Sequence, residues 1–430
     1  MRRPSVWAQL VGASGAVVEG VDIEEDDDGA PLVVVRAHVA KRHRNRCGIC
    51  AAKCPGYDAG SGRRRWRALD LGTTAAVIEA AAARVSCRVH GVVVAALPWA
   101  RHGAGHTRDF DDAVAWMVVV MNKSSVADFF GIAWRTVGSI ITRVEADFCA
   151  STDRLSGLRR IGIDEISYKR GHKYLTVVVD HDTGHLVWAA PGRDRKAVES
   201  FFDALGEERS AQLTHVSADA AEIIAAVVSR RAPQAVRVAD PFHVVAWATD
   251  ALDDVRRAVW NTARRTPGAP RTSQGTGRAA VPVTEVSRKL KNARYALWKN
   301  PEDLTVSQRA KLDWIAKTSP GLHRAYLLKE GLRYVFKVKG DEGKEALEKW
   351  LAWAARSRIP AFVMLGQRIR RYREPIEASL HSGLSNGLIE STNTKIRVLT
   401  RMAFGFKDPH ALVALALLSL GGARPALPGR

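Results

Sequence analysis

Arg160-Ile-Gly-Ile-Asp-Glu165 opens the stretch of sequence that decides the fold. From residue 159 to residue 240, short apolar runs alternate with segments of helical composition. Strands that alternate with helices in this way indicate an α/β domain. The expected strands cover residues 160–164, 173–180, 185–190, 213–219 and 235–240, and the expected helices cover residues 194–206 and 220–231.

Carboxylates end two of these strands, and a third lies on a helix expected to begin near Asn386. Asp164 closes the first strand, Asp219 closes the fourth, and Glu390 lies on the helix. If the sheet brings them together, the acids form an oxygen-rich site that a divalent cation such as Mg²⁺ satisfies. Two such ions, roughly 3.5–4 Å apart, would promote in-line phosphoryl displacement. A strand-end aspartate is also a common turn or cap residue, so each acid alone is weak evidence.

The helix that carries Glu390 has two distinct faces. Glu390, Asn393 and Arg397 share one face at positions i, i+3 and i+7. Ile389 and Ile396 share another face, which is suited to packing. Lys395 and Arg397 are the candidate DNA contacts on this helix.

Composition favours a polyanionic partner. The 430 residues suffice for two to four domains, and 65 Lys and Arg against 45 Asp and Glu give a net charge of +20. Such a charge favours nucleic acid because each neutralised phosphate releases a counterion, although a simply cationic surface is the alternative. No long apolar segment opens the sequence, and the apolar run 411–420 is shorter than the roughly 20 residues that span a bilayer. We expect a cytoplasmic, nucleoid-associated protein with no membrane partner.

Two short motifs near the start have the spacing of a zinc site. Cys47 and Cys50 form a Cys-x-x-Cys knuckle, and Cys87 and His90 form a Cys-x-x-His knuckle. Two knuckles of two ligands each are the usual way to build a tetrahedral Zn²⁺ site. Between Cys50 and Cys87 lie 87 − 50 = 37 positions, more than the roughly 15–20 usual between knuckles, so free buried cysteines remain the alternative. Cys54 ranks below Cys87 as a substitute ligand.

Two segments have the composition of DNA-binding elements. Arginines surround Trp66 between the knuckles, which suits phosphate contacts or a solvated face. We expect a short helix at residues 124–131, ending in Gly131, and a second helix at residues 134–145. This arrangement is typical of a helix-turn-helix, although an ordinary helical hairpin is the alternative. The expected DNA contacts are Arg63, Arg64, Arg65, Arg67, Arg135, Thr136, Ser139 and Arg143, and the expected packing residues of the second helix are Val137, Ile140, Ile141 and Val144.

Three further stretches are predicted from local composition. Residues 22–28 contain six acidic residues and precede Gly29, which predicts a solvated loop. Residues 32–40 alternate enough to form a strand. Residues 266–282 are rich in Pro, Gly, Ser and Thr, which predicts an exposed loop.

In this order, the motifs resemble the ISL-three family of bacterial insertion-sequence transposases over nearly the whole chain. The resemblance rests on the cysteine knuckles, the helix-turn-helix, Gly162-Ile-Asp-Glu-Ile-Ser-Tyr-Lys-Arg-Gly-His172, Val216-Ser-Ala-Asp219, Ala239-Asp-Pro-Phe-His-Val-Val245 and Ser385-Asn-Gly-Leu-Ile-Glu390 through Arg401-Met-Ala-Phe-Gly-Phe406. The last three motifs together are highly specific. One departure is that the second knuckle ends in histidine, whereas two Cys-x-x-Cys knuckles are common in such zinc ribbons.

The resemblance implies an RNase H-like α/β catalytic domain with an acidic DDE triad. On the matching positions the triad is Asp164, Asp219 and Glu390, with Mg²⁺ or Mn²⁺ as the cofactor. The family also implies a helical insertion before the glutamate, which fits the 390 − 219 = 171 positions between the last two acids. The domains expected are a zinc-ribbon-like head (1–107), a helix-turn-helix (108–152), the catalytic domain (153–249 and 376–430) and a helical insertion (250–375).

Asp240-Pro-Phe-His243 is the family's other hallmark. His243 could orient the scissile phosphate or donate a hydrogen bond to it, or it could cap a helix. Asp240 is the main competitor of Asp219 for the second metal-ligand position. Asp219 is preferred because the strand–helix–strand order puts its strand beside the first strand in an RNase H-like sheet.

Taken with the resemblance, the residues imply a DNA transposase that cleaves and joins strands at insertion-sequence ends. Its partners would be the terminal inverted repeats and target DNA, bound by a homodimer or larger assembly. Two rivals remain open at this point. One is a DNA-binding regulator derived from a transposase, and the other is an RNase H-like nuclease that cuts but does not join.

Overall fold

A computed structural model describes residues 6–219, 222–265, 285–422 and 425–429. Internal contacts divide the chain into two compact units, Met1–Arg154 with Lys395–Arg430, and Leu155–Thr394. The sequence assigns residues 376–430 to the catalytic domain, whereas the contacts group residues 395–430 with the N-terminal part of the chain. The loop expected at residues 266–282 lies outside the described residues.

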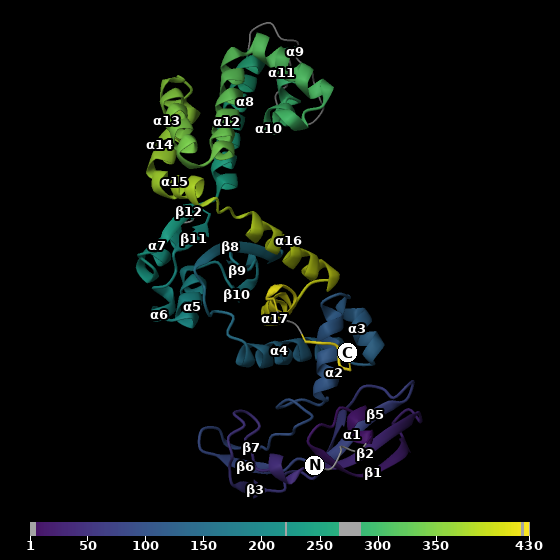
Figure 1. The fold of residues 1–430 in the computed structure, drawn as a ribbon. Coiled ribbons are helices and arrows are strands. Elements are labelled where there is room, and N and C mark those ends of the chain that lie inside the picture. Colours follow the sequence, from purple (N-terminus) through teal and green to yellow (C-terminus); the bar gives the residue numbers. More distant parts are fainter. Residues whose placement is uncertain (1–5, 220–221, 266–284, 423–424, 430) are drawn as a thin grey trace. The chain divides into compact units, whose positions relative to one another are not determined.

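A five-stranded sheet forms the centre of the second unit (Figure 1). All five expected strands are confirmed, one with the expected ends and four with shifted ends: β8 (Arg160–Lys169), β9 (Lys173–Asp180), β10 (Leu186–Pro191), β11 (His215–Ala218) and β12 (Val236–Ala239). Their order is β10-β9-β8-β11-β12. Within this sheet, β9 pairs antiparallel with both β8 and β10, and β11 pairs parallel with both β8 and β12. β11 ends at Ala218, opposite Ile163, whereas β8 continues to Lys169. The prediction that Asp164 closes the first strand is therefore wrong, because β8 goes on pairing with β9 beyond it.

Helices pack on this sheet because their apolar residues recur at helical spacing. These helices are α5 (Arg195–Leu205) and α7 (Glu222–Arg231), while the four-residue α6 (Glu207–Ser210) has no apolar residue and contacts α5. Asp194 caps α5 by accepting a hydrogen bond from the Ala197 amide. Phe201 and Phe202 are fully buried against Ile161 and Ile163 of β8. The first expected helix and the described part of the second are therefore confirmed.

A large helical insertion separates β12 from the helix that carries Glu390. It comprises α8 (Pro241–Arg265), α9 (Glu285–Lys291), α10 (Arg294–Trp298), α11 (Val306–Thr318), α12 (Pro320–Val338), α13 (Gly340–Arg356), α14 (Pro360–Arg371) and α15 (Arg373–Ser382). These helices bury their own core, which includes Leu328, Leu347 and Phe362. Proline at the first position of α12 and of α14 suits a helix start, where no amide donor is needed. The chain then enters α16 (Gly387–Met402).

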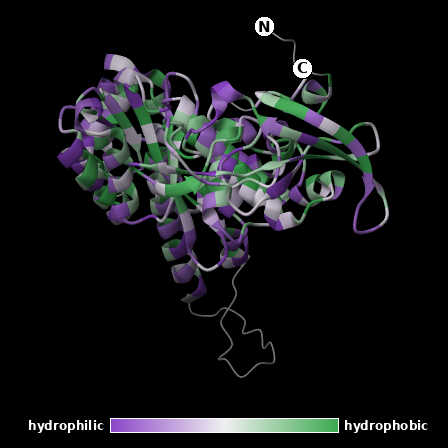
Figure 2. Ribbon diagram, turned by 90° about the horizontal axis from the view of Figure 1, so that it is seen from below, coloured by the Kyte–Doolittle hydropathy of each residue, from purple (hydrophilic) through white to green (hydrophobic). Residues whose placement is uncertain are grey.

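Two small sheets form the start of the first unit. One has the order β1-β2-β5-β4 and contains β1 (Ala16–Glu25), β2 (Pro31–Val39), β5 (Ala75–Ala81) and β4 (Arg63–Arg67). The other has the order β3-β6-β7 and contains β3 (Gly56–Asp58), β6 (Arg84–Cys87) and β7 (Gly91–Val94). The short helix α1 (Val6–Leu10) precedes them. In Figure 2 hydrophobic residues run along the strands of the sheets, while hydrophilic residues mark the loops and one side of many helices.

The expected strand at residues 32–40 is confirmed as β2, but the loop prediction for residues 22–28 is wrong in part. Residues 22–25 continue β1, and only Asp26 to Gly29 form the turn. The reason is electrostatic, because Asp22 and Glu24 pair with Arg36 of β2. Neutralised acids can remain in a strand that their repulsion would otherwise disfavour.

Four helices complete the first unit: α2 (Arg108–Val118), α3 (Lys123–Phe130), α4 (Trp134–Ser151) and α17 (Pro409–Leu420). Asn122 caps α3 at its start, and Gly131 ends it at φ +62°, a left-handed conformation that favours glycine. Helix α17 packs against α4. No helix in the described ranges combines the length and the apolar character needed to cross a bilayer.

Candidate functional site

Asp164 lies on β8, and its carboxylate accepts two hydrogen bonds. Its Oδ1 accepts from the Glu165 amide at 2.7 Å, and its Oδ2 accepts from Asn393 Nδ2 of α16 at 2.7 Å. Burial raises the pKa of this carboxyl, and the charge of Asp219 raises it further, against the hydrogen bonds and the charge of His243. Asp164 therefore lies in the electrostatic field of two other candidate residues.

Asp219 lies directly after β11. In the parallel pair, Ala218 of β11 is opposite Ile163 of β8, so the next residue on each strand is an aspartate. Asp219 is half-buried, as is Asp164. The parallel pairing therefore brings the first two predicted acids to neighbouring positions, Asp164 inside β8 and Asp219 just beyond the end of β11.

Glu390 lies in the first turn of α16 and is exposed. Asn393, which contacts Asp164, follows it by three positions, and side chains at this spacing are about 5–6 Å apart at Cβ. Across the described ranges, Asp164, Asp219 and Glu390 do not form a group whose ligand atoms all lie within 4.8 Å of one another. The structure thus places Glu390 one helical turn from the residue that contacts Asp164, without closing the triad.

The approach of α16 to β8 depends on Gly162. Ile389 of α16 is fully buried, and a Cβ added at Gly162 would overlap its Cδ1 atom. Ile396 is also fully buried, which confirms the predicted packing face. Asn393 is buried with these two residues instead of lying on the exposed face that Glu390 occupies. Its contact with Asp164 was not predicted, although its place one turn after Glu390 was visible in the sequence.

Asp240 is only 2% exposed, and one of its carboxylate oxygens, Oδ1, holds backbone amides, while the buried Oδ2 has no hydrogen-bond partner among the described residues. Its Oδ1 accepts from the Phe242 amide of α8 and from the Asn386 amide before α16, each at 3.3 Å. Its Oδ2 lies 3.8 Å from His243 Nε2. Asp240 therefore joins the two ends of the helical insertion.

A buried polar network continues from Asp240 into the sheet. Ser217 of β11 donates to Asn386 Oδ1 at 2.8 Å, and its Oγ lies 2.7 Å from His181 Nε2. Sequence reasoning missed Ser217, Asn386 and His181, although the first two lie in the motifs Val216-Ser-Ala-Asp219 and Ser385-Asn-Gly. The network fixes the start of α16 next to the strand that ends at Asp219.

The predicted zinc ligands converge. The ligand atoms of Cys47, Cys50, Cys87 and His90 all lie within 4.8 Å of one another. His90 Nδ1 is 3.6 Å from the sulfurs of both Cys47 and Cys87, and Cys50 Sγ is 3.8 Å from Cys87 Sγ. A tetrahedron with bonds of roughly 2.3 Å has edges of roughly 3.8 Å, so these residues fit Zn²⁺. Cys54 is outside this group, with its sulfur 3.3 Å from the Ala52 carbonyl oxygen.

Electrostatics at Cys87 favour metal binding, whereas the pKa values of Cys50 and His90 are raised by neighbouring knuckle residues. Backbone amides of His90 and Val89, together with the His90 side chain, lower the pKa of Cys87 to about 6. Zinc binds the thiolate, so a lowered thiol pKa favours binding at neutral pH.

Three of the four head arginines are paired within the chain. Arg63 pairs with Glu19 and Glu79, and Arg65 pairs with Glu24 and Glu79. Arg67 pairs with Asp70. Arg64 points to the other face of β4, is exposed, and lies 5.8 Å from the ring centroid of Trp66. Of the four, Arg64 is the arginine without a carboxylate partner among the described residues.

The helix-turn-helix has the predicted inner face. Val137, Ile140, Ile141 and Val144 of α4 are fully buried. On the outer face, Arg135 and Ser139 are exposed and Thr136 is half-buried. Arg143 instead pairs with the buried Asp111, through contacts of 3.0 and 3.3 Å. Lys395 and Arg397 of α16 are exposed.

Comparisons with known families agree with this architecture. A zinc-finger family of the IS204, IS1001, IS1096 and IS1165 transposases matches residues 43–90. The helix-turn-helix domain of transposase family ISL3 matches residues 95–145, and the DDE transposase domain of the same family matches residues 161–416. A zinc ribbon, a DNA-binding helix-turn-helix and a mixed α/β domain of this kind define a DDE transposase.

Two named relatives resemble the whole chain. The transposase for insertion sequence element IS1557 of Mycobacterium tuberculosis is 59% identical over 437 aligned positions, covering 100% of this chain and 98% of the relative. The transposase for insertion sequence element IS1001 of Bordetella parapertussis is 27% identical, covering 93% and 94% of the two chains. The chain belongs to the ISL3 family of insertion-sequence transposases. Its helix-turn-helix and transposase domains imply that it binds DNA.

Proposed function

We propose that the second unit has an RNase H-like fold in which Asp164, Asp219 and Glu390 bind Mg²⁺ or Mn²⁺ for DNA strand cleavage and strand transfer. The observation that carries the proposal is the parallel pairing of β8 with β11, which sets Asp164 beside Asp219. The sheet order, with three antiparallel strands followed by two parallel ones, supports the fold assignment.

The side chains around the acids have separable roles in this proposal. The Glu165 amide and Asn393 fix the orientation of the Asp164 carboxylate. Asp219 contributes the second carboxylate, and their mutual repulsion favours a cation between them. Divalent ions held there supply an activated attacking oxygen and stabilise the leaving oxygen. Glu390 completes the set from α16.

The reaction has two balanced steps. Water attacks a phosphodiester at the element end, the P–O3′ bond breaks, and a free 3′-hydroxyl and a 5′-phosphate result. That 3′-hydroxyl then attacks a target phosphodiester, forms a new P–O3′ bond and releases a target 3′-hydroxyl. His243 would orient the phosphate, because its side chain is partly exposed and interacts electrostatically with Asp164.

Asp240 is a positioning residue in this proposal. Its burial and its bonds to Phe242 and Asn386 leave it unsuited to ligate a metal shared with DNA. Instead it would set the start of α16 and hence the position of Glu390.

The other parts of the chain supply recognition. Residues 1–107 and 108–152 would bind the terminal inverted repeats, residues 153–249 and 376–430 would form the catalytic domain, and residues 250–375 the insertion. The proposed DNA contacts are Arg64, Arg135, Lys395 and Arg397, which have no carboxylate partner among the described residues, together with Thr136 and Ser139 beside Arg135 on α4. Two element ends must be held together, so we propose a homodimer or larger assembly on DNA, in the nucleoid of the cytoplasm.

The test is Mg²⁺-dependent cleavage and strand joining on DNA that carries the element's own end. Asp219→Asn and Glu390→Gln should bind the end but give no product, whereas Asp240→Asn should keep a reduced rate. Circular dichroism and end binding serve as folding controls for all three variants. If Asp219→Asn stays active while Asp240→Asn is dead, the second acid is wrong. Cutting without joining would favour a nuclease, and binding without cutting would favour a regulator.

A further inference from the structure

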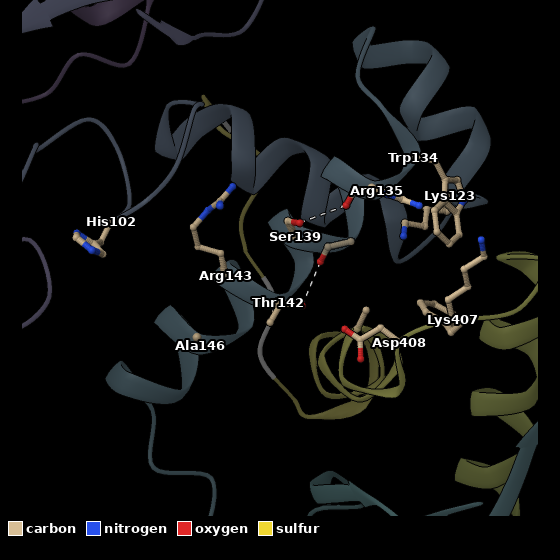
Figure 3. A pocket seen from close by; sticks show the side chains of 13 residues that line it. His102, Lys123, Trp134, Arg135, Ser139, Thr142, Arg143, Ala146, Lys407 and Asp408 are labelled. Atoms are coloured by element: carbon tan, nitrogen blue, oxygen red, sulfur yellow. Dashed lines mark hydrogen bonds between the residues drawn. The ribbon is translucent and has the colours of Figure 1, made fainter. Parts of the chain in front are cut away.

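A cavity of about 760 Å³ lies between α4 and the segment that links α16 to α17, within the first unit. Figure 3 shows Lys123, Arg135 and Lys407 near Trp134 at one end of it. Its lining includes Arg135, Ser139, Thr142 and Arg143 of α4, and Lys407 and Asp408 of the linking segment. The cavity therefore borders the outer face of the second helix of the helix-turn-helix.

Lys123 is the unusual member of this lining because it is only 3% exposed. Its Nζ lies 3.4 Å from the ring centroid of Trp134 and 5.9 Å from that of Phe406. Within the described part of the chain its ammonium has neither a hydrogen bond nor an ion pair. Two aromatic faces attract a cation, but they leave the N–H donors unused.

Gly138 makes room for this ammonium. A Cβ added at Gly138 of α4 would lie 2.9 Å from Lys123 Nζ. Glycine inside a helix is otherwise unfavourable, so the close approach of the ammonium gives the residue a physical reason. The ammonium is thereby placed against the α4 backbone, at the wall of the cavity.

A second buried lysine shows what a satisfied ammonium looks like in this protein. Lys329 of α12 is 2% exposed, and its Nζ donates to the carbonyls of Leu297, Trp298 and Lys299 at 3.0–3.4 Å. It also pairs with Glu330 at 2.5 Å. Lys123 has no such set of acceptors. Burial lowers the pKa of Lys123 to about 8, partly opposed by Asp408, so an anion in the cavity would relieve an existing cost.

Few of the other polar groups in the lining are free to bind an anion. Arg143 is paired with Asp111, and Asp408 caps α17 by accepting from the His410 amide. Ser139 and Thr142 donate to carbonyls of their own helix. Arg135 and Lys407 are exposed and flank Lys123 from two different elements. At this end of the cavity, Lys123, Arg135 and Lys407 are therefore the cations without a carboxylate partner among the described residues, and together they suit a singly charged oxyanion that bridges them.

We propose that this cavity seats one backbone phosphate of the bound DNA, with Lys123 donating to it and Arg135 and Lys407 flanking it. The inference rests on the DNA binding that the helix-turn-helix implies, and not on the acidic triad. Its consequence is that the DNA-binding surface is not made by α2–α4 alone. The chain that leaves α16 returns to complete it, so the helix that bears Glu390 is followed directly by a DNA contact.

The test compares wild type with Lys123→Met, Gly138→Ala and Lys317→Met on a duplex that carries the element end, without divalent metal. A contact with one phosphate contributes about 0.9 to the slope of log affinity against log salt. Lys123→Met should lower that slope by about 0.9 and weaken binding to end and unrelated duplexes by similar factors. Lys317→Met, an exposed lysine of α11, makes the same change of net charge and should leave the slope unchanged.

Gly138→Ala keeps the result interpretable if Lys123→Met folds poorly. Alanine favours the helix, so this variant should melt no lower than wild type, yet its Cβ displaces the ammonium and should weaken binding several-fold. A scan with single methylphosphonate linkages supplies the site-specific arm. At one position in the duplex, a methylphosphonate linkage should weaken DNA binding by wild type but should not weaken binding by Lys123→Met any further. The proposal fails if wild type does not bind, if no linkage behaves in this way, or if Gly138→Ala binds like wild type.

Discussion

The two metal-binding regions of this transposase differ in how complete they are in the folded chain. In the head, Cys47, Cys50, Cys87 and His90 already lie within 4.8 Å of one another. In the catalytic unit, Asp164 and Asp219 are neighbours while Glu390 is exposed on α16. Thiols and imidazole attract each other through weak hydrogen bonds, whereas three carboxylates repel. In the function that we propose, the structural site is preformed, whereas the acidic site would depend on a cation to draw Glu390 in as its last ligand.

Removal of a zinc ligand should have the largest effect and directly tests whether the head site is a structural metal site. Cys87→Ser should reduce bound zinc from about one ion per chain to nearly none, because a structural site needs all four ligands. The head should then become sensitive to protease while the catalytic unit stays resistant. Zinc content by atomic absorption and limited proteolysis measure both effects.

Cys54→Ser is the matched control for that prediction. Cys54 is buried beside the knuckles, but its sulfur is outside the ligand group. The Cys54→Ser variant should therefore retain about one zinc ion per chain. Zinc lost in Cys54→Ser and kept in Cys87→Ser would reverse the assignment.

The next prediction concerns the contact that links α16 to Asp164. Asn393→Ala removes the hydrogen bond to the Asp164 carboxylate, and loss of such an outer partner typically costs about 10–100-fold in activity or metal affinity. Strand cleavage should fall by that factor and require more Mg²⁺, with end binding unchanged. Thr394→Ala, an exposed neighbour, is the control. An unchanged Mg²⁺ requirement in Asn393→Ala would mean that Asn393 only packs.

These elements also show how far sequence reasoning reaches. The five strands, the position of Asp219 directly after one of them, and the four zinc ligands follow from periodicity and spacing, whereas Asp164 lies inside β8 instead of at its end. Resemblance to the family supplied the link between Asp164 and Glu390, which are 390 − 164 = 226 positions apart. The polar network of Ser217, Asn386 and Asp240 could not be predicted, because hydrogen bonds between distant segments leave no periodic signal. The pairing of Arg63 and Arg65 with acids of β1 and β5 is hidden for the same reason.

A smaller effect should appear in the pH dependence of stability. Burial raises the pKa of Asp164, so the folded state holds its proton to higher pH than the unfolded chain does. The stability of wild type relative to Asp164→Asn should therefore fall as pH rises from about 4, by at most about 1.4 kcal/mol per unit, and level off above the folded pKa. Denaturant unfolding in a chelator measures this difference.

Magnesium should reverse that pH effect in wild type and not in Asp164→Asn. The cation stabilises the ionised carboxylate, so the benefit requires residue 164 to carry a charge. If the free energies of unfolding of the two proteins changed with pH in the same way, the ionised Asp164 carboxylate would not destabilise the folded state. The difference between preformed and unfinished sites would then need another explanation.

The smallest predicted effect concerns charge in the head, where internal pairing again leaves one side chain free. Arg64→Ala should lower the salt slope of DNA binding by about 0.9, because Arg64 is exposed and has no carboxylate partner among the described residues. Arg63→Ala should leave that slope unchanged and cost about 0.2–1 kcal/mol of stability, as exposed ion pairs do. Equal slopes for the two variants would mean that DNA competes successfully for Arg63. The head would then be rearranged by its ligand, as we argue for the acidic site, instead of being preformed.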